Sequence, residues 1–503
     1  MMLPSCRTVA LPAVGWLMLL APAFAEPTAW HGPHPADLEA HRDHTVLSDL
    51  IGDGTRPSMA LQSAPKSAAT RPVVFGFLPY WIDQTYYHQL DFGLLTHIAA
   101  FSVEVSPEGR ISNDRGWPWT ALVDSAHAHG VRVILTATLF GDSQVLALIS
   151  NETRRQRFFV EIRDQLIAGN ADGVNIDFEG PGANGWPSQI NDFMAQLTGY
   201  LHAEIPGCEV SFAAPPVDWA GRWDFVGLAA SCDYLFIMGY AFTGSWSDRS
   251  GPTAPLHGGS RNITTTITGD YGEVSEQNPA KLILGVPYYG CQWTTSAPDA
   301  RSLTTRFVRY PQIWSTFLGA VTHGSHWDAT SETPWYRYQD GAEWVQVWYD
   351  DIMSLGMKYD LALDKGLRGV GMWALGYEGR RAEPWELLQQ KIGRREPATV
   401  VGESPVFGVL RLEQNYPNPF NSSTRVQAEI PAAGRVEITI FDVLGQRVRT
   451  WYQPHVPPSV IVWEWDGLDD ANQPVASGIY TYRLHFGAPA AGRQLTRRMV
   501  LTR

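Results

Sequence analysis

Two carboxylates separated by a single residue, Asp177 and Glu179, lie in the stretch of this chain best suited to chemistry. Residues 172–179, Asp-Gly-Val-Asn-Ile-Asp-Phe-Glu, alternate between apolar and polar side chains. Because successive side chains of a strand point to opposite faces, this alternation predicts a strand with Asn175, Asp177 and Glu179 together on one face. Enclosed carboxylates are costly unless they are paired, hydrogen-bonded or protonated, so we favour catalysis as the reason for them. The alternative, an exposed edge strand with a solvated acidic face, would leave the apolar face uncovered.

Strands and helices alternate from residue 71 onward, which is the pattern of a parallel α/β fold. The predicted strands are Val73–Pro79, His97–Phe101, Val131–Thr138, Gly173–Glu179, Glu209–Ala214, Tyr234–Tyr240, Lys281–Pro287 and Gly369–Leu375. The predicted helices, which have apolar residues three to four apart, are Trp119–His129, Arg154–Ala168, Ser188–Ile205 and Val345–Lys365. Glu179 ends the fourth strand, and barrel active sites lie at the carboxyl ends of the strands. The sequence therefore predicts a (β/α)8 TIM barrel over residues 71–393.

The octet at residues 172–179 resembles the DGxDxDxE signature of glycoside hydrolase family 18, the chitinase-like (β/α)8 barrels. Asp172, Gly173, Asp177 and Glu179 match, and Asn175 stands where the family usually has Asp. Further matches are Phe75–Trp81 in the first strand, Met238–Tyr240 in the sixth, Gly285–Gly290 in the seventh and Gly371–Trp373 in the eighth. The Asn variant is similar to the branch that includes cell-wall and spore-cortex N-acetylglucosaminidases as well as some chitinases.

The resemblance implies hydrolysis of a β-1,4 bond to N-acetylglucosamine by substrate-assisted, retaining catalysis, without a metal or an organic cofactor. Glu179 would be the acid, Asp177 would hold the acetamido N–H, and Tyr240 would hydrogen-bond the acetamido carbonyl. Trp373 would form the floor of the −1 subsite. The remaining candidates for substrate binding are Asn175, Asp172, Tyr80, Phe101, Met238 and Tyr289.

We make a further prediction for two of these candidates, Asn175 and Phe101. We expect the amide of Asn175 to donate a hydrogen bond to Asp177, because an amide cannot share a proton as a second carboxyl would. For Phe101, as for Phe77 and Trp81, a place in the hydrophobic core is as well supported as contact with sugar.

The substrate class stays open at this point, because chitin and peptidoglycan share the acetamido group that the mechanism needs. A catalytically silent chitin-binding lectin is the alternative of a different class, and the retained Glu179 argues against it. The chain has 38 basic and 51 acidic residues, a formal net charge of −13, which argues against a nucleic-acid partner or an anionic membrane surface. We expect a monomer.

The first 25 residues have the pattern of a secretory signal peptide: Arg7, an apolar run at residues 9–20, and Ala-Phe-Ala before Glu26. Residues 26–70 are rich in Pro, His, Ala and Ser without periodicity, which predicts a pro-segment or linker. The histidines clustered there are His31, His34, His41 and His44. They could bind a metal, but we favour an unfolded tract because no ordered partner ligands are evident. No later segment has about 18 consecutive apolar residues, so no transmembrane helix is predicted.

The segment Cys291–Asp364 forms an insertion between the seventh and eighth strands and resembles a reduced form of the family's insertion. Its candidate sugar platforms are Trp293, Trp335, Tyr336 and Trp344. Asp350 and Asp351 precede a helical run, and we expect them to cap it. Cys208 and Cys232 open adjacent strands, where Cα atoms about 5–6 Å apart would permit a disulfide.

Short alternating strands with turn signals follow residue 395, which predicts a linker at 394–411 and a separate β-sandwich at 412–503. The expected strands include Arg435–Phe441, Val460–Trp465 and Gly478–Phe486. The blocks Asn415–Asn421, Trp465–Gly467 and Ala476–Tyr480 resemble C-terminal sorting domains of the type IX secretion system. This resemblance implies the type IX machinery of an outer-membrane-bearing bacterium as a partner. The exported protein would then be released or attached to the cell surface. A carbohydrate-binding module is the alternative.

Overall fold

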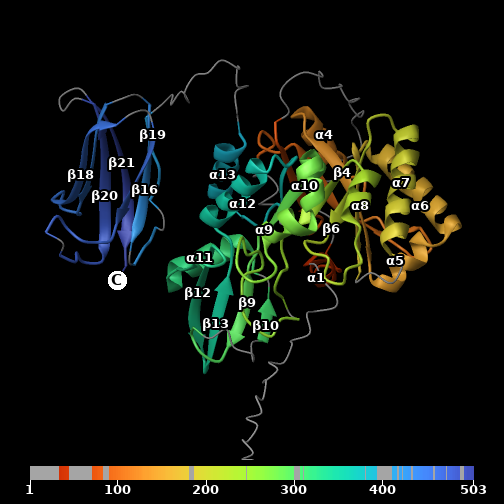
Figure 1. Ribbon diagram of the computed structural model, residues 1–503, viewed down its shortest axis with the longest axis horizontal. Helices are drawn as coiled ribbons and strands as arrows, with labels where there is room; N and C mark the ends of the chain where they lie inside the picture. Colours follow the sequence, from red (N-terminus) through yellow and green to blue (C-terminus); the bar gives the residue numbers. More distant parts are fainter. Residues whose placement is uncertain are drawn as a thin grey trace, which may run out of the picture.

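The structure is a computed structural model, shown in Figure 1. It describes residues 33–44, 71–82, 90–180, 186–244, 246–299, 306–309, 311–379, 381–393, 410–415, 418–421, 423–431, 434–456, 459–471, 473–487 and 492–502. The predicted signal peptide and most of the predicted linker at 394–411 lie outside these residues, and the domain limits stay predictions. Within the described residues, no helix combines the length and apolar character that crossing a membrane requires.

Eight parallel strands close into a barrel, which confirms the predicted TIM-barrel fold. Their order is β1-β14-β8-β7-β6-β5-β4-β2, the pairing of β1 with β2 closes the ring, and β3 adds to β2 antiparallel. The strands are β1 (Val73–Pro79), β2 (His97–Val105), β3 (Ile111–Asn113), β4 (Arg132–Phe140), β5 (Gly173–Glu179), β6 (Glu209–Ala214), β7 (Tyr234–Met238), β8 (Leu282–Pro287) and β14 (Gly369–Trp373). All eight predicted strands are present, and β2 differs most because it ends at Val105 rather than Phe101.

Helices cover the outside of the barrel (Figure 1). They are α4 (Thr120–Ala128), α5 (Asp142–Ile149), α6 (Glu152–Gly169), α7 (Trp186–Glu204), α8 (Phe225–Ser231), α9 (Ile263–Thr265), η1 (Thr266–Asp270), α10 (Gly272–Gln277), η2 (Pro279–Lys281), α12 (Ile352–Asp364) and α13 (Glu383–Lys391). The apolar face of β5 meets this layer: the Phe178 ring lies 5.8 Å from Phe158 of α6 and 5.7 Å from Phe193 of α7. The polar face of β5 therefore points into the barrel, as its alternation predicts.

The insertion between β8 and β14 folds as an antiparallel sheet in the order β10-β9-β13-β12-β11, with α11 (Ile313–His323) beside it. Its strands are β9 (Cys291–Thr295), β10 (Arg306–Arg309), β11 (His326–Asp328), β12 (Thr333–Asp340) and β13 (Glu343–Trp348). The predicted helix Val345–Lys365 is therefore wrong in its first part, because residues 343–348 pair with both β12 and β9. Trp293 and Tyr336 are buried in the packing of the insertion, so they are not the sugar platforms we expected.

The two carboxylates before α12 have different roles. Asp351 is the N-cap, and its side chain accepts from the backbone N–H groups of Met353 and Ser354. Asp350 is not a cap. It forms a buried ion pair with Lys358 of α12, and both side chains are at most 1% exposed. The expectation of two capping residues is thus confirmed for Asp351 and wrong for Asp350.

Cys208 and Cys232 are free, buried thiols, which corrects the expected disulfide. Their sulfur atoms face backbone carbonyls instead of each other: Cys208 Sγ lies 3.8 Å from the Glu209 oxygen, and Cys232 Sγ lies 3.3 Å from the Leu228 oxygen. Burial raises the pKa of each thiol to about 12, so both stay protonated at neutral pH.

The C-terminal residues form a second hydrophobic core between a three-stranded and a four-stranded antiparallel sheet, in agreement with the predicted sandwich. The strands are β15 (Arg411–Leu412), β16 (Thr424–Ile430), β17 (Gly434–Phe441), β18 (Arg447–Val456), β19 (Ser459–Trp465), β20 (Gly478–Phe486) and β21 (Arg493–Leu501). Trp465, Tyr482 and Met499 are buried between the sheets, because alternate side chains of each strand point inward.

Candidate active site

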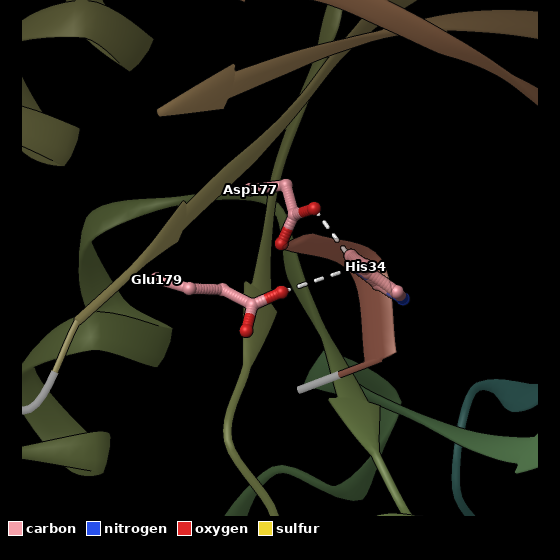
Figure 2. Close-up of side chains that lie close together, drawn as sticks. All are labelled: His34, Asp177 and Glu179. Atoms are coloured by element: carbon pink, nitrogen blue, oxygen red, sulfur yellow. Dashed lines mark hydrogen bonds and ion pairs between the residues drawn. The ribbon is translucent and has the colours of Figure 1, made fainter. Parts of the chain in front are cut away.

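The inner face of β5 carries Asn175, Asp177 and Glu179, which are 0%, 0% and 6% exposed. Asp177 and Glu179 lie at the carboxyl end of the strand, where barrel active sites form. Figure 2 shows that both carboxylates point to the same place, which the ring of His34 occupies. His34 belongs to α1 (Pro33–Ala40), a helix of the predicted pro-segment.

The two carboxylates meet one nitrogen of His34. Nδ1 donates to Asp177 Oδ2 at 2.8 Å and lies 3.4 Å from Glu179 Oε1. In the neutral ring this leaves Nε2 as an acceptor, and the Tyr240 hydroxyl donates to it at 3.0 Å. A single five-membered ring therefore contacts the three residues that the sequence predicts to be catalytic.

Tyr240 is fully buried beside the two carboxylates. Its burial, followed by the negative charges of Asp177 and Glu179, raises the pKa of the Tyr240 hydroxyl well above its usual value of 10. The phenol consequently keeps its proton and acts as a hydrogen-bond donor toward whatever occupies the site.

Aromatic rings form the floor and wall of the space around His34. The centroid of the His34 ring lies 3.8 Å from that of Trp373, at an interplanar angle of 34°. Phe77 and Phe101 lie 5.5 and 5.6 Å from the same imidazole, and both are fully buried. Trp373 thus lies under the ring as the floor of this space, and Phe101 combines the two roles considered for it, core packing and contact with the site's occupant.

One predicted site residue, Asp172, lies at the other end of the barrel. Asp172 precedes β5 at its amino end, and its Oδ2 accepts from His127 Nε2 at 2.8 Å and from the Val133 N–H at 2.7 Å. Seven residues of extended strand, at about 3.3 Å each, place it about 23 Å from Glu179. The structure therefore does not bring Asp172 to the site. It ties the loop before β5 to β4 and α4.

Asn175 is on the inner face, but its amide does not donate to Asp177 as expected. Nδ2 donates to Ser211 Oγ of the neighbouring β6 at 2.9 Å. The reason is register: Asn175 lies directly opposite Ser211 in the parallel β5–β6 pair, whereas Asp177 is two residues further along the same strand.

The remaining predicted residues surround the same end of the barrel. Tyr289 is buried, with its ring 6.0 Å from that of Tyr240. The Tyr80 hydroxyl donates to the backbone oxygen of His41, which follows α1. Met238 lines a cavity next to Glu179.

This cavity extends the site beyond the carboxylates. It is lined by Phe178, Glu179, Gly180, Ala213, Pro215, Val217, Trp219, Ala220, Trp223 and Met238. Trp219 and Trp223 are half-buried and packed against the barrel core, so their rings are held in place at its rim. Neither tryptophan was predicted, because the loop after β6 has no periodicity that separates a cleft residue from a core residue.

His34 and Asp37 are the other site residues that the sequence did not identify. The Asp37 carboxylate accepts from Trp373 Nε1 at 2.9 Å and from the Tyr377 hydroxyl at 3.2 Å. The only signal available was the His-rich composition of the segment, which we attributed to an unfolded tract. That expectation is wrong for residues 33–40, which form a helix whose ordered partners come from the barrel.

His34, Asp177 and Glu179 each offer a ligand atom within 4.8 Å of the others, a spacing compatible with a bound metal ion. Two ligands of a tetrahedral zinc ion, each about 2.0–2.1 Å from the metal, are about 3.3 Å apart. The 2.8 Å contact between His34 Nδ1 and Asp177 Oδ2 is shorter and corresponds to a direct, charge-assisted hydrogen bond.

The arrangement is suited to acid-assisted bond cleavage in an enclosed site. Glu179 lies at the boundary between the space occupied by His34 and the adjoining cavity, while Asp177 and Tyr240 converge on one side of it. A substrate bound across this boundary would place the scissile bond next to Glu179 and a polar substituent between Asp177 and Tyr240.

The chain is similar to known proteins over both the barrel and the C-terminal sandwich. The model of glycosyl hydrolases family 18 matches residues 76–378, and that of the FlgD Ig-like domain matches residues 418–486. Human di-N-acetylchitobiase is 29% identical over 306 residues, which cover 54% of this chain and 76% of the human protein. The cortical fragment-lytic enzyme of Bacillus subtilis (strain 168) is 25% identical over 298 residues, covering 56% of this chain and 65% of that enzyme.

A GH18 chitinase from Cycas revoluta, solved in complex with (GlcNAc)3, superposes with a TM-score of 0.55 at 19% identity, over 63% of this chain and 99% of that one. This likeness concerns the fold. The FlgD match describes an immunoglobulin-like domain and leaves the predicted type IX sorting role a prediction. Since the family 18 model spans more than half of the chain and covers every strand of the barrel except the first part of β1, this protein belongs to glycoside hydrolase family 18.

Proposed function

We propose that the barrel cleaves β-1,4 bonds of N-acetylglucosamine-containing polysaccharide, with chitin or chitooligosaccharides as substrate, by substrate-assisted retaining catalysis. One observation carries the proposal: Asp177, Glu179 and Tyr240 converge on a single ring that lies over Trp373. A pyranose bound over the same indole would have its 2-acetamido group and its glycosidic oxygen within reach of these groups.

Each residue then has a task that its position supports. Glu179, between the −1 position and the adjoining cavity, protonates the glycosidic oxygen as the leaving sugar departs toward that cavity. Asp177 accepts from the acetamido N–H, and Tyr240 donates to the acetamido carbonyl, so that its oxygen is aligned to attack the anomeric carbon. Asp177 also stabilises the positive oxazolinium that forms. Water then opens this intermediate with Glu179 as the base, and the configuration is retained.

The adjoining cavity supports binding of the leaving part of the substrate. Trp219 and Trp223 offer flat apolar surfaces next to Glu179, and sugar rings stack on such surfaces. An enzyme with a site on both sides of the acid cleaves a bond between two bound sugars, which accords with an oligomeric substrate.

The second candidate substrate is peptidoglycan, whose glycan also carries the acetamido group. The 25% identity to a protein named cortical fragment-lytic enzyme favours this candidate, and the identity to a protein named di-N-acetylchitobiase favours the first. A catalytically silent chitin-binding lectin is a third possibility, against which the presence of Glu179 argues.

The test is Glu179→Gln, with Glu276→Gln as the control because Glu276 is an exposed glutamate on α10. We expect the first variant to lose at least about a hundredfold in kcat on chitooligosaccharides while it still binds them, because an amide cannot supply the proton. The control keeps the wild-type rate. A Glu179→Gln rate above a tenth of wild type would exclude Glu179 as the acid.

Product analysis distinguishes the three candidates. Wild-type protein is incubated separately with chitooligosaccharides and with peptidoglycan, and the released sugars are identified by mass spectrometry. Products from the first polymer alone favour the chitin proposal, and products from the second alone replace it. Binding of either sugar without any product identifies a lectin.

We further propose that the chain is exported and that its C-terminal sandwich is read by type IX secretion machinery. The sequence pattern of residues 1–25 and the blocks that resemble sorting domains support this proposal. N-terminal sequencing of the protein recovered from the medium of an expressing type IX-competent bacterium tests it. A first residue of Met1, or equal recovery after deletion of residues 412–503, would contradict it.

A further inference from the structure

Residues 33–44, here called the α1 segment, occupy the carboxyl-end mouth of the barrel. The segment contains α1, and residues 45–72 of the sequence separate it from β1. Its side chains reach strands on different sides of the ring: His34 contacts Asp177 of β5 and Trp373 of β14, and it lies next to Phe77 of β1. The segment therefore fills the space that the proposed function requires for substrate.

His34 reproduces the interactions assigned above to an N-acetylglucosamine unit. Its flat ring lies over Trp373 as a pyranose would, its N–H donates to Asp177 as the acetamido N–H would, and its second nitrogen accepts from Tyr240 as the acetamido carbonyl would. The side chain is fully buried, so it excludes both water and sugar from this position.

Further contacts extend along one face of the segment. Asp37 accepts from Trp373 and Tyr377, and the His41 ring stacks on Trp81 at 4.6 Å with an interplanar angle of 3°. His34, Asp37 and His41 are spaced at i, i+3 and i+7, which places them on one side of a helical turn and leaves Glu39 exposed on the other. The three side chains on this face therefore all contact residues of the barrel.

Asp37 is stabilised in the cleft as part of a polar cluster. Burial raises the pKa of its carboxyl. The hydrogen bonds from Trp373 and Tyr377 and the nearby His34 and His41 lower this pKa, but by less than burial raises it. Its contact with Trp373 Nε1 fixes the same indole that forms the floor under His34, so the two residues hold the site jointly.

We propose that the α1 segment is an autoinhibitory pseudo-substrate, which keeps the hydrolase inactive until the segment is displaced or removed. This inference rests on the proposed function. Substrate binds only to the fraction of molecules whose cleft is free, so the apparent kcat/KM equals the uninhibited value multiplied by that fraction. Covalent attachment raises the effective concentration of the segment at the cleft, so modest contacts suffice for inhibition.

The first test compares kcat/KM of full-length variants on a soluble chromogenic N-acetylglucosamine oligomer. Loss of a hydrogen bond to a charged group changes an equilibrium by about tenfold or more. We expect His34→Ala and Asp37→Ala to raise kcat/KM by about tenfold each, and the double variant to raise it further. Glu39→Ala is the matched control on the exposed face of the same helix and leaves the rate unchanged. Measurable hydrolysis at the same rate by His34→Ala, Asp37→Ala and Glu39→Ala overturns the proposal.

The second test adds the segment back as a synthetic peptide of residues 33–44. The peptide should inhibit the double variant competitively with the sugar, and the same peptide with His34→Ala should not. Calorimetric titration of both peptides into the double variant measures their binding without any sugar. Binding of the first peptide, with no hydrolysis by any variant, rejects the proposed substrate while it keeps the segment as a ligand of the cleft. Absence of peptide binding and of competition overturns the inference itself.

Discussion

Glu209 connects four strands and the residue before a fifth at the amino end of the barrel, away from the proposed catalytic residues. Its Oε2 accepts from His97 Nε2 at 2.9 Å and from the Tyr234 hydroxyl at 3.2 Å. Its Oε1 lies 3.3 Å from Arg132 Nη1 and 3.4 Å from Arg368 Nη2. Glu209 itself begins β6, and its four partners come from β2, β7, β4 and the residue before β14. One carboxylate therefore links these strands at the amino end of the barrel.

The stability that the ionised Glu209 contributes follows from its pKa. Burial alone would raise the pKa, but the His97 hydrogen bond and the positive charges of His97, Arg132 and Arg368 lower it from 4.5 to about 2. At about 1.4 kcal/mol per pH unit, this difference corresponds to about 3 kcal/mol. Because the folded-state pKa is the lower one, the contribution is fully present above pH 4.5 and is lost as the pH falls toward 2.

We therefore expect Glu209→Gln to reduce the free energy of unfolding of the barrel by up to about 3 kcal/mol at pH 7, and the gap to wild type to narrow as the pH falls from 4.5 to 2. Urea unfolding at pH 7, 5, 4 and 3, followed by tryptophan fluorescence, measures both. Asp164→Asn is the control, since Asp164 pairs with Arg163 while 58% exposed and should change stability little. An equal gap between Glu209→Gln and wild type at pH 7 and pH 3 would refute the electrostatic reasoning.

Two further predictions concern buried polar groups. Asn175→Asp adds a buried carboxyl two residues before Asp177, and because like charges in an enclosed site oppose ionisation we expect the acid limb of the pH–rate profile to move to higher pH. Superimposable profiles of variant and wild type on one soluble substrate would show that position 175 is uncoupled from the proposed catalytic carboxylates. Lys358→Met leaves Asp350 buried without its partner, which should cost about 3–5 kcal/mol in urea unfolding, whereas Lys358→Met combined with Asp350→Leu should cost much less. Equal losses in the single and double variants would be inconsistent with an ion-pair effect.

The sequence alone determined the barrel and the strand that carries the proposed catalytic carboxylates, because both depend on local patterns. Alternation with period two in residues 173–179 set which side chains face inward, and the outward Phe178 packs on two helices as that alternation requires. Strand order followed from the regular succession of strands and helices. Tyr240 and Trp373 were predicted differently, from the resemblance of residues 238–240 and 371–373 to the family's sixth and eighth strands.

Tertiary structure decided which of the polar groups meet. The amide of Asn175 bonds to Ser211 because β5 and β6 pair in a particular register, and Asp350 bonds to Lys358 because burial removes it from water. The first pair joins residues 36 positions apart on two strands, and the second forms on a face of α12 whose burial depends on the rest of the barrel.

The largest departure from the sequence-based expectation is the α1 segment. Composition predicts an unfolded His-rich tract at residues 26–70, since such a segment cannot bury enough apolar surface by itself. His34 is nevertheless fully buried, because Asp177, Tyr240 and Trp373 supply its hydrogen-bond partners and its apolar contact from positions 143, 206 and 339 residues away in the chain. A one-dimensional pattern shows what a segment can do alone, whereas the stability of this helix lies in a cleft that exists only after the barrel has closed.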